Sequence, residues 1–316
     1  MKIPVLDDLI FKIVSSKLPA ISETEMEALE SGTDDKGWVA EIMKGSPDWS
    51  KLFELDKPEL SDDEQAFIDG PVEELCEMID VWKLNETDKE LPDEIIQFMK
   101  DNKFFGMVLP KEFGGLGFTA LGHSAAVMKI ASRSGGAAVT AMVPNSLGPG
   151  ELLVHYGTDE QKDKYLPALS NGDLVPCFGL TELTAGSDAG AIKAHGRVVK
   201  GEDGRLKLKL NFEKRYITLA PMADLVGLAF KLEDPDGLLP EGVLREDNPN
   251  ITTCLINVHD ENGETVPGLD IGSRHDPSGV RFLNGMIIGN DVEIDVEDHV
   301  IGGYDGVGWG WKMLME

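Results

Sequence analysis

The sequence predicts an α+β fold: an N-terminal all-helical domain, then an antiparallel β-barrel-like middle domain, then the start of a C-terminal helical domain. Three observations carry this prediction. Capping boxes followed by apolar helical stripes occur before residue 173, and short apolar runs with alternation follow it. A glycine-rich stretch near the end then leads into a new helical segment, which the sequence enters but does not complete.

We therefore expect four segments: a helical extension at 1–60, a helical domain at 61–173, a β domain at 174–301 and the start of a C-terminal helical domain at 302–316. The first segment contains a run of apolar residues at helical spacing. We expect it to form an amphipathic helix that packs on the core, or else one that lies on a partner or a membrane. These residues are Ile3, Val5, Leu6, Leu9, Ile10 and Ile13.

Helix-start signals recur along the second segment. A capping box at Ser61–Glu64 precedes an apolar stripe, and Pro92, followed by two acidic residues, starts another helix. Thr119 precedes a helix of small and apolar residues, and Thr158–Gln161 forms a second capping box whose helix ends at Gly172. This half of the chain therefore reads as helical throughout.

Short apolar and alternating runs in the third segment predict strands. A first strand at 174–180 is followed by strands at 192–199 and 205–212, which the loop Lys200–Gly204 joins as a hairpin. The segment 234–250 is rich in proline, glycine and acidic residues, so we expect a surface excursion between two strands. Further strands are expected at 215–219, 224–232, 251–258 and 286–294.

Composition excludes several classes of function. The 316 residues carry a net charge of −28, which argues against binding nucleic acid, because that requires clustered Lys and Arg. The three cysteines, Cys76, Cys177 and Cys254, show no CxxC spacing, and this favours a reduced, intracellular protein. The six histidines are scattered without metal-ligand spacing, so no metal site is expected.

Residues 177–188 carry most of the functional information. A strand-like apolar run ends where Thr181, Thr184, Gly186, Ser187 and Asp188 crowd together. Small residues let a backbone approach a flat or polyanionic ligand closely, and hydroxyls then fix its orientation. The segment therefore predicts a ligand-binding strand end and loop.

Five stretches together resemble the acyl-CoA dehydrogenase family, and in particular its long bacterial FadE-type branch. The most specific is GLTELTAGSD at 179–188, and PKEFGGLG at 110–117 and YGTDEQKDKYLP at 156–167 precede it in order. KRYITLAP at 214–221 and VPGLDIG at 266–272 follow. The resemblance runs from about residue 60 to the last residue.

The resemblance implies flavin adenine dinucleotide (FAD) as cofactor and acyl-CoA as substrate. Phe178, Leu180 and Thr181 would contact the isoalloxazine, with Thr181 on its pyrimidine side. Gly186 and Ser187 would meet the pyrophosphate, and Ser187 would also face the acyl-CoA. Tyr216, Ile217 and Thr218 would lie on the opposite flavin region, with the Thr218 hydroxyl near the N5 atom that accepts hydride.

Plainer interpretations of the same residues stay open. Thr181 and Thr218 are also ordinary strand residues, Gly186 is a turn glycine, and Tyr216 could belong to the core. Glu182 with Asp188 would form a solvated acidic loop, in which Asp188 caps or braces the backbone.

The resemblance further implies α,β-dehydrogenation of medium- or long-chain acyl-CoA to trans-2-enoyl-CoA in fatty acid β-oxidation, with electrons passed to an electron-transfer flavoprotein or a similar carrier. The family's catalytic base usually lies in the C-terminal helical domain, and Glu316 does not match it, so no catalytic residue is expected in this chain. A homo-oligomer is expected at full length, in the cytoplasm or against the inner face of the membrane. The alternatives are an acyl-CoA oxidase and a noncatalytic fragment that binds FAD or acyl-CoA.

Overall fold

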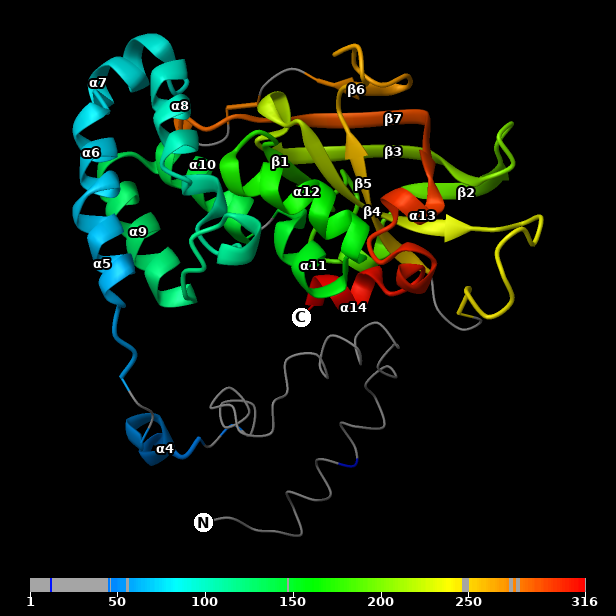
Figure 1. The fold of residues 1–316 in the computed structure, drawn as a ribbon, viewed down its shortest axis with the longest axis horizontal. Helices are drawn as coiled ribbons and strands as arrows, with labels where there is room; N and C mark the ends of the chain where they lie inside the picture. Colours follow the sequence, from blue (N-terminus) through cyan, green and yellow to red (C-terminus); the bar gives the residue numbers. More distant parts are fainter. Residues whose placement is uncertain are drawn as a thin grey trace.

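The computed structural model describes residues 47–54, 57–146, 148–245, 250–272, 275–276 and 279–315, together with positions 12 and 45. The apolar run expected to form a helix at 3–13 lies outside this range apart from position 12, and so does Glu316. Within it, a helical part precedes a curled, mixed β-sheet, which confirms the α+β class (Figure 1).

Helices form the first part of the described chain. After α4 (Trp49–Glu54), the helices of this part are α5 (Asp62–Asp69), α6 (Pro71–Met78), α7 (Val81–Lys83), α8 (Asp93–Asp101), α9 (Ala120–Arg133), α10 (Gly135–Ser146), α11 (Pro149–Tyr156) and α12 (Asp159–Asn171). Both predicted capping boxes are present, at Ser61 and Thr158, and Thr119 caps α9. Gly172 ends α12 with a φ of 74°, a left-handed conformation that glycine adopts without strain.

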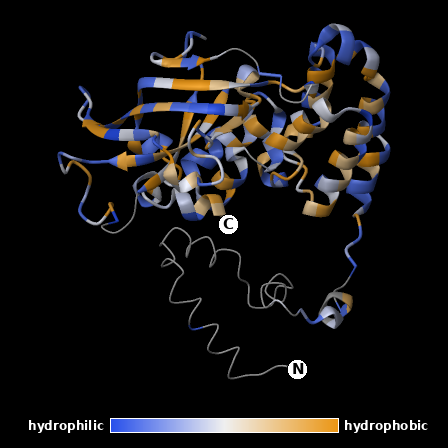
Figure 2. Ribbon diagram, turned by 180° about the vertical axis from the view of Figure 1, so that it is seen from behind, coloured by the Kyte–Doolittle hydropathy of each residue, from blue (hydrophilic) through white to orange (hydrophobic). Residues whose placement is uncertain are grey.

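Strands make up the second part, and they join into one sheet in the order β1-β4-β2-β3-β7-β6, with β5 beside β4. Their bounds are β1 (Pro176–Gly179), β2 (His195–Lys200), β3 (Leu206–Thr218), β4 (Leu225–Glu233), β5 (Ile251–Asn257), β6 (Leu269–Ile271) and β7 (Asn284–Asp295). Figure 2 shows strands on which apolar and polar residues alternate, as expected for a sheet with one face in the core.

The sheet differs from the expected antiparallel one in two pairings. β4 pairs in parallel with β1 over Leu225–Leu228 and with β2 over Lys231–Glu233, while the other strand pairs are antiparallel. β1 and β2 therefore share one edge of β4, end to end. Alternation in a sequence reveals a strand but not the direction of its neighbour, because the direction depends on how the connections return.

Strand β3 is longer than expected. The runs at 205–212 and 215–219, predicted as two strands, form one strand that pairs with β7 and changes register twice, between Leu210 and Phe212 and between Lys214 and Ile217. Arg215 and Tyr216 there oppose a single residue of β7, so the strand bulges instead of ending. The hairpin loop between β2 and β3 is confirmed, with Lys200 paired to Leu206. The short strand β6 was not expected.

Helices α11 and α12 connect the two parts of the fold, lying beneath the sheet in Figure 1. Leu153 of α11 and Tyr165 of α12 share a buried apolar cluster with Leu225 of β4 and Leu255 of β5. The cluster also contains Met313, which belongs to α14 (Gly310–Met315) and follows the short helix α13 (Val296–His299). This packing brings α10, α11 and α14 to the ends of β1 and β3. Among the described helices, none combines the length and the apolarity that a membrane span requires.

Candidate functional site

A cavity of about 870 Å³ opens where the helical part meets the ends of β1 and β3. Three regions of the chain contribute to its lining. The helical wall comes from α10, α11 and the turn between them, the sheet wall from the ends of β1 and β3, and the last wall from α14. The lining residues are Val143, Ser146, Gly148, Glu151, Leu152, His155, Tyr156, Phe178, Leu180, Thr181, Tyr216, Ile217, Thr218, Met313, Leu314 and Met315.

Six of the eight residues predicted to contact the flavin line this cavity together: Phe178, Leu180, Thr181, Tyr216, Ile217 and Thr218. They come from two segments more than thirty residues apart in the sequence. The other two, Gly186 and Ser187, lie in the exposed turn after β1 and are not among the lining residues.

The end of β1 is held at its backbone. The carbonyl oxygen of Leu180 accepts a hydrogen bond from Lys214 Nζ at 2.9 Å, and that of Thr181 accepts one from the Arg215 N–H at 3.1 Å. The Thr181 hydroxyl has no partner among the described residues, so it is free to bind a group in the cavity. Gly227 of β4 lies against the ring of Phe178, and a Cβ at this glycine would lie 2.5 Å from a ring carbon.

The end of β3 has an unusual backbone. Tyr216 and Leu219 both have positive φ values, 57° and 66°, and they bracket Ile217 and Thr218. Non-glycine residues adopt this conformation at a cost of order 1–3 kcal/mol, and such strain clusters at functional sites. The bulge and the two left-handed residues together turn the last residues of β3 toward the cavity.

Asn284 of β7 contacts the Thr218 hydroxyl. Its Nδ2 atom donates to Thr218 Oγ1 at 3.4 Å, which leaves the hydroxyl hydrogen of Thr218 free to donate elsewhere. The side chain of Asn284 is buried, and its Oδ1 has no partner among the described residues. A buried polar atom without a partner marks a place where an additional group completes the hydrogen bonding.

Tyr216 is not a core residue. Its side chain is 57% exposed, which contradicts the plainer interpretation of this aromatic as part of the sheet core. The His275 ring packs on it with centroids 5.0 Å apart, and the Arg215 guanidinium lies 5.4 Å from its ring centroid. Ile217 lines the cavity as Tyr216 does, but it also belongs to the apolar core of the sheet.

The interpretation of Glu182 as part of a solvated acidic loop is wrong. Glu182 is 8% exposed, and its Oε1 lies 2.8 Å from Nζ of Lys214, a lysine that is fully buried. Burial raises the pKa of Glu182, but hydrogen bonds from Lys214 and from two backbone N–H groups outweigh it and lower the pKa overall. Sequence reasoning missed Lys214 because a charged residue within an alternating strand normally faces solvent. Asp188, in contrast, is exposed.

The helical wall adds two ionisable groups that the sequence did not single out. Glu151 and His155 lie one turn apart on α11, and both line the cavity. His123 lies nearby on α9, where burial lowers its pKa and the charge of Glu151 partly offsets this. No cluster of side chains able to hold a metal ion occurs among the described residues.

These features fit a flat, partly polar cofactor such as the flavin of FAD. Phe178, Leu180 and Ile217 supply apolar contact, and the Thr181 and Thr218 hydroxyls supply donors from two sides. Gly148, in the turn between α10 and α11, lines the cavity, and a Cβ there would lie 2.9 Å from the Pro144 carbonyl oxygen, so the tight turn favours glycine. The donor set suits flavin carbonyls and ring nitrogens.

Residues 61–173 match the acyl-CoA dehydrogenase N-terminal domain. The match begins at the capping serine of α5 and ends just after the glycine that terminates α12. It therefore covers the helical part of the described fold from α5 to α12.

Curated relatives align with part of the chain. The chain is 36% identical to a 3-(aryl)acrylate reductase of Clostridium sporogenes over 199 residues, which are 62% of this chain and 47% of that protein. An acyl-CoA dehydrogenase of Bacillus subtilis is 32% identical over 49% of this chain and 39% of its own length. The caffeyl-CoA reductase-Etf complex subunit CarC of Acetobacterium woodii is 40% identical over 44% of this chain and 35% of its own length. The chain thus spans less than half the length of these relatives.

Solved structures share the fold over most of the chain. One is a chain from a structural study of the electron transferring flavoprotein of Acidaminococcus fermentans. It superposes with a TM-score of 0.66 and 27% identity, over 82% of this chain and 62% of that one. An acyl-CoA dehydrogenase from Bacillus anthracis, solved with FAD, gives a TM-score of 0.65 and 20% identity, over 83% of this chain and 42% of its own. The likeness extends through the helical part and the sheet.

The fold is a helical part followed by a mixed β-sheet, and the cavity lies between the two. Over residues 61–173 the chain is similar to the N-terminal domain of acyl-CoA dehydrogenases, and beyond that match it shares the fold of the solved structures.

Proposed function

We propose that this chain forms the flavin-binding part of an FAD-dependent acyl-CoA dehydrogenase of fatty acid β-oxidation. One observation carries the proposal: two strand ends that are distant in sequence, Phe178–Thr181 and Tyr216–Thr218, line the same cavity. Each bears a threonine whose hydroxyl hydrogen is not used by its surroundings. Two hydroxyls presented from neighbouring strand ends suit a planar, hydrogen-bonding ring system.

The proposal gives each residue a defined task. Thr181 would donate to the pyrimidine side of the isoalloxazine, and Thr218, held by Asn284, would donate near N5. Phe178, Leu180 and Ile217 would exclude water from the ring, and Tyr216 would cover its edge. Donors fixed before reaction stabilise negative charge without reorganising. Bound FAD would supply the two-electron acceptor for the oxidation.

Gly186 and Ser187 keep the tasks of meeting the pyrophosphate and the substrate, from the exposed turn beside the cavity. The proposed substrate is a medium- or long-chain acyl-CoA, which loses one hydrogen from the α carbon and one from the β carbon to give trans-2-enoyl-CoA. No catalytic base is assigned to the described residues. We also propose the division 1–60, 61–173, 174–301 and 302–316 as the domain organisation.

An electron-transfer flavoprotein is the proposed redox partner, and a homo-oligomer the proposed assembly of the full-length protein. The resemblance to acyl-CoA dehydrogenases supports the first of these, and so does the relative CarC, a subunit of a caffeyl-CoA reductase-Etf complex.

A second candidate function is the reverse reaction, reduction of a 2-enoyl thioester or acid. Two of the relatives, from Clostridium sporogenes and Acetobacterium woodii, are described as reductases of unsaturated acids or their thioesters. The same binding residues serve both directions, since hydride and proton transfer retrace one path. The redox partner then decides the direction.

FAD binding tests the first element of the proposal. The purified chain is equilibrated with FAD, freed of unbound flavin and measured by absorbance and by titration. We expect Thr181→Val and Thr218→Val each to weaken FAD binding by roughly tenfold, about the effect of one lost hydrogen bond. Thr184→Val is the matched control, because Thr184 is exposed in the same loop and does not line the cavity. Equal affinity in all three variants would contradict the proposed site.

Substrate turnover then separates the candidate functions. The full-length protein is mixed with acyl-CoA and an electron-accepting dye, with acyl-CoA and oxygen, and with enoyl-CoA and a reduced dye. Dye reduction supports the dehydrogenase, and peroxide formation indicates an acyl-CoA oxidase. Faster consumption of enoyl-CoA favours the reductase. The noncatalytic alternative is tested on the 316-residue chain by itself, and turnover of acyl-CoA by that chain would contradict it.

A further inference from the structure

We propose that the buried ion pair between Glu182 and Lys214 is a positioning device that fixes the Thr181 end of the cavity before any ligand binds. The inference rests on the proposed function, since it gives these two residues a role in flavin binding. It concerns residues that neither line the cavity nor belong to the set expected to touch the cofactor. They act through the backbone of Thr181.

Lys214 ties two strand ends together. Its Nζ donates to the carbonyl oxygen of Leu180 at 2.9 Å and lies 2.8 Å from Glu182 Oε1, so it bonds to the residues on both sides of Thr181. The N–H of the next residue, Arg215, donates to the Thr181 carbonyl oxygen at 3.1 Å. Three consecutive residues directly after β1, Leu180 to Glu182, are thereby fixed by two consecutive residues of β3.

Glu182 holds the far end of the loop that follows. Its Oε2 accepts from the Lys193 N–H at 2.7 Å, and its Oε1 accepts from the Ala194 N–H at 2.9 Å. The backbones of Glu182 and Ala185 also pair with each other. One carboxylate therefore closes the loop at 182–194, the loop that carries Gly186 and Ser187, and joins it to the start of β2.

The position of Lys214 in β3 extends this control to the second strand end. The bulge begins directly after Lys214, and Tyr216 in its left-handed conformation belongs to it. Thr218 follows four residues after Lys214. The buried position of Lys214 determines where the bulge starts. The start of the bulge in turn determines that Ile217 and Thr218 face the cavity.

A buried pair is a poor device for stability alone. Both charges lose their hydration, and apolar residues of similar volume in such places are often as stable or more so. An ion pair with several hydrogen bonds instead favours one arrangement of its side chains, because the buried polar atoms all have partners only in that arrangement. Gly179 beside the Lys214 stem leaves room for it, since a Cβ there would lie 3.2 Å from Lys214 Cγ.

Variants of the pair test the inference by FAD affinity at a matched folded fraction. We expect Lys214→Met, and the double variant Glu182→Leu with Lys214→Met, to bind FAD at least tenfold more weakly and to change the visible circular dichroism of bound flavin. The double variant carries no unpaired charge, so it serves where the single variant does not fold. The control is Glu64→Gln, which alters another buried carboxylate that holds backbone N–H groups away from the cavity.

Each outcome has a separate meaning. Weaker binding in the pair variants with unchanged binding in the control supports the inference. A folded double variant that binds FAD like the wild type, with the same flavin spectrum, overturns it. If the wild-type chain itself does not bind FAD, the proposed function is wrong. That result differs from one in which the wild type and the variants bind FAD equally well.

Hydrogen exchange on the wild-type chain gives a test that requires no substitution. The amides of Lys193, Ala194 and Arg215 donate to Glu182 or to Thr181. If the pair fixes the site in advance, these amides are protected without FAD, and FAD changes their exchange rates by less than about threefold. Fast exchange that becomes slow only on addition of FAD would show that the flavin orders the loop, and the inference would be wrong.

Discussion

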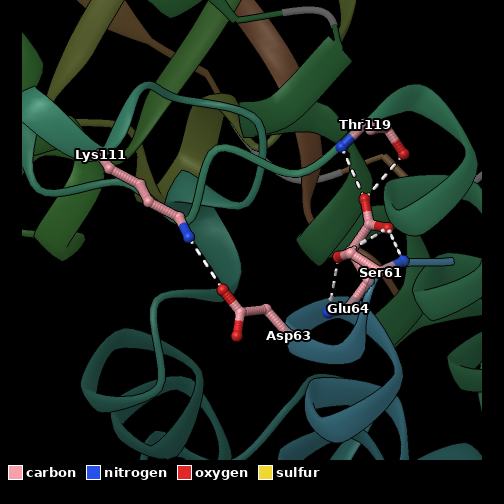
Figure 3. A network of polar contacts seen from close by, with 5 residues as sticks. All are labelled: Ser61, Asp63, Glu64, Lys111 and Thr119. Atoms are coloured by element: carbon pink, nitrogen blue, oxygen red, sulfur yellow. Dashed lines mark hydrogen bonds and ion pairs between the residues drawn. The ribbon is translucent and has the colours of Figure 1, made fainter.

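Two buried carboxylates, Glu64 and Glu182, hold the two halves of this molecule in different ways. Glu64 accepts hydrogen bonds from the N–H and hydroxyl of Thr119, at 2.8 and 2.7 Å, and from those of Ser61, at 2.8 and 3.1 Å (Figure 3). It thereby joins the starts of α5 and α9 without a cation among its described partners. Glu182 accepts from two backbone N–H groups and also pairs with Lys214.

The difference shows that hydrogen bonds alone can keep a buried carboxylate charged. Burial by itself raises the pKa of Glu64, but the bonds from Ser61 and Thr119 outweigh it and lower the pKa to about 2. A buried lysine is therefore not required to stabilise such a group. At Glu182 the lysine also bonds to the Leu180 carbonyl oxygen, which is a contact to the wall of the cavity. The helical carboxylate serves the fold, and we infer that the sheet carboxylate serves the site.

The largest effect on stability is expected from breaking the ion pair on one side. Lys214→Met leaves Glu182 buried without its cation, and removal of one partner of a buried pair costs about 3–5 kcal/mol. Urea unfolding of variant and wild type measures this cost. The double variant with Glu182→Leu should recover most of it, and a single variant as stable as the wild type would contradict the buried geometry.

The next effect is expected from crowding Glu64. Gly122 lies against its carboxylate, and a Cβ at Gly122 would come closer to Glu64 Oε1 than real Cβ atoms come to any neighbour. We expect Gly122→Ala to destabilise the fold by about 1–3 kcal/mol, because the network must shift to admit a methyl group. Gly186→Ala is the matched control, since no atom lies within 4 Å of a Cβ at Gly186. Thermal unfolding of both variants decides the point.

An effect of similar size, but dependent on pH, is expected from Glu64→Gln. The pKa of Glu64 in the fold lies below its ordinary value of 4.5, so its contribution to stability is present above pH 4.5 and is lost as the pH falls toward about 2. Near pH 7 the variant should be less stable by roughly 1–3 kcal/mol. The difference between wild type and variant should shrink steadily below pH 4.5. A difference that stays constant from pH 7 to pH 3 would show that the charge of Glu64 does not matter.

The smallest effect is expected from Asp63, the neighbour of Glu64 that reaches Lys111 at 2.9 Å (Figure 3). Both side chains of this pair are about 70% exposed, at 73% and 68%. Exposed ion pairs contribute about 0–1 kcal/mol, so Asp63→Asn should leave the free energy of unfolding nearly unchanged. A loss comparable with that of Glu64→Gln would mean that the surface pair and the buried network act as one unit.

Much of the fold was predictable because its signals are local. The serine and threonine caps at 61, 119 and 158 need only their own helix to act, and all three are present. Alternation revealed most strands but divided β3 in two at 213–214, between its two register shifts, because such irregularities interrupt the alternation that marks a strand. The parallel pairings of β4 could not be predicted from alternation, because they depend on how the chain brings β1 and β2 to the edge of β4.

The candidate site was partly predictable for the same reason. Motif residues at 178–181 and 216–218 line one cavity, as expected of residues that share a ligand, while their contact with FAD stays a prediction. Glu182 and Lys214 were not recognised as partners, because they are 32 residues apart and a charge in either place reads as solvated. Glu151 and His155 were missed as well, since helical spacing alone does not tell which face meets a sheet.

By itself, the sequence determined the kinds of elements, their caps and the two threonine-bearing strand ends, since these follow from interactions within a few residues. Only the tertiary structure decided that the two strand ends meet, that Tyr216 turns outward and that a lysine lies buried beneath Thr181. Those outcomes depend on contacts between distant segments, and burial then determines whether a charge is solvated or paired.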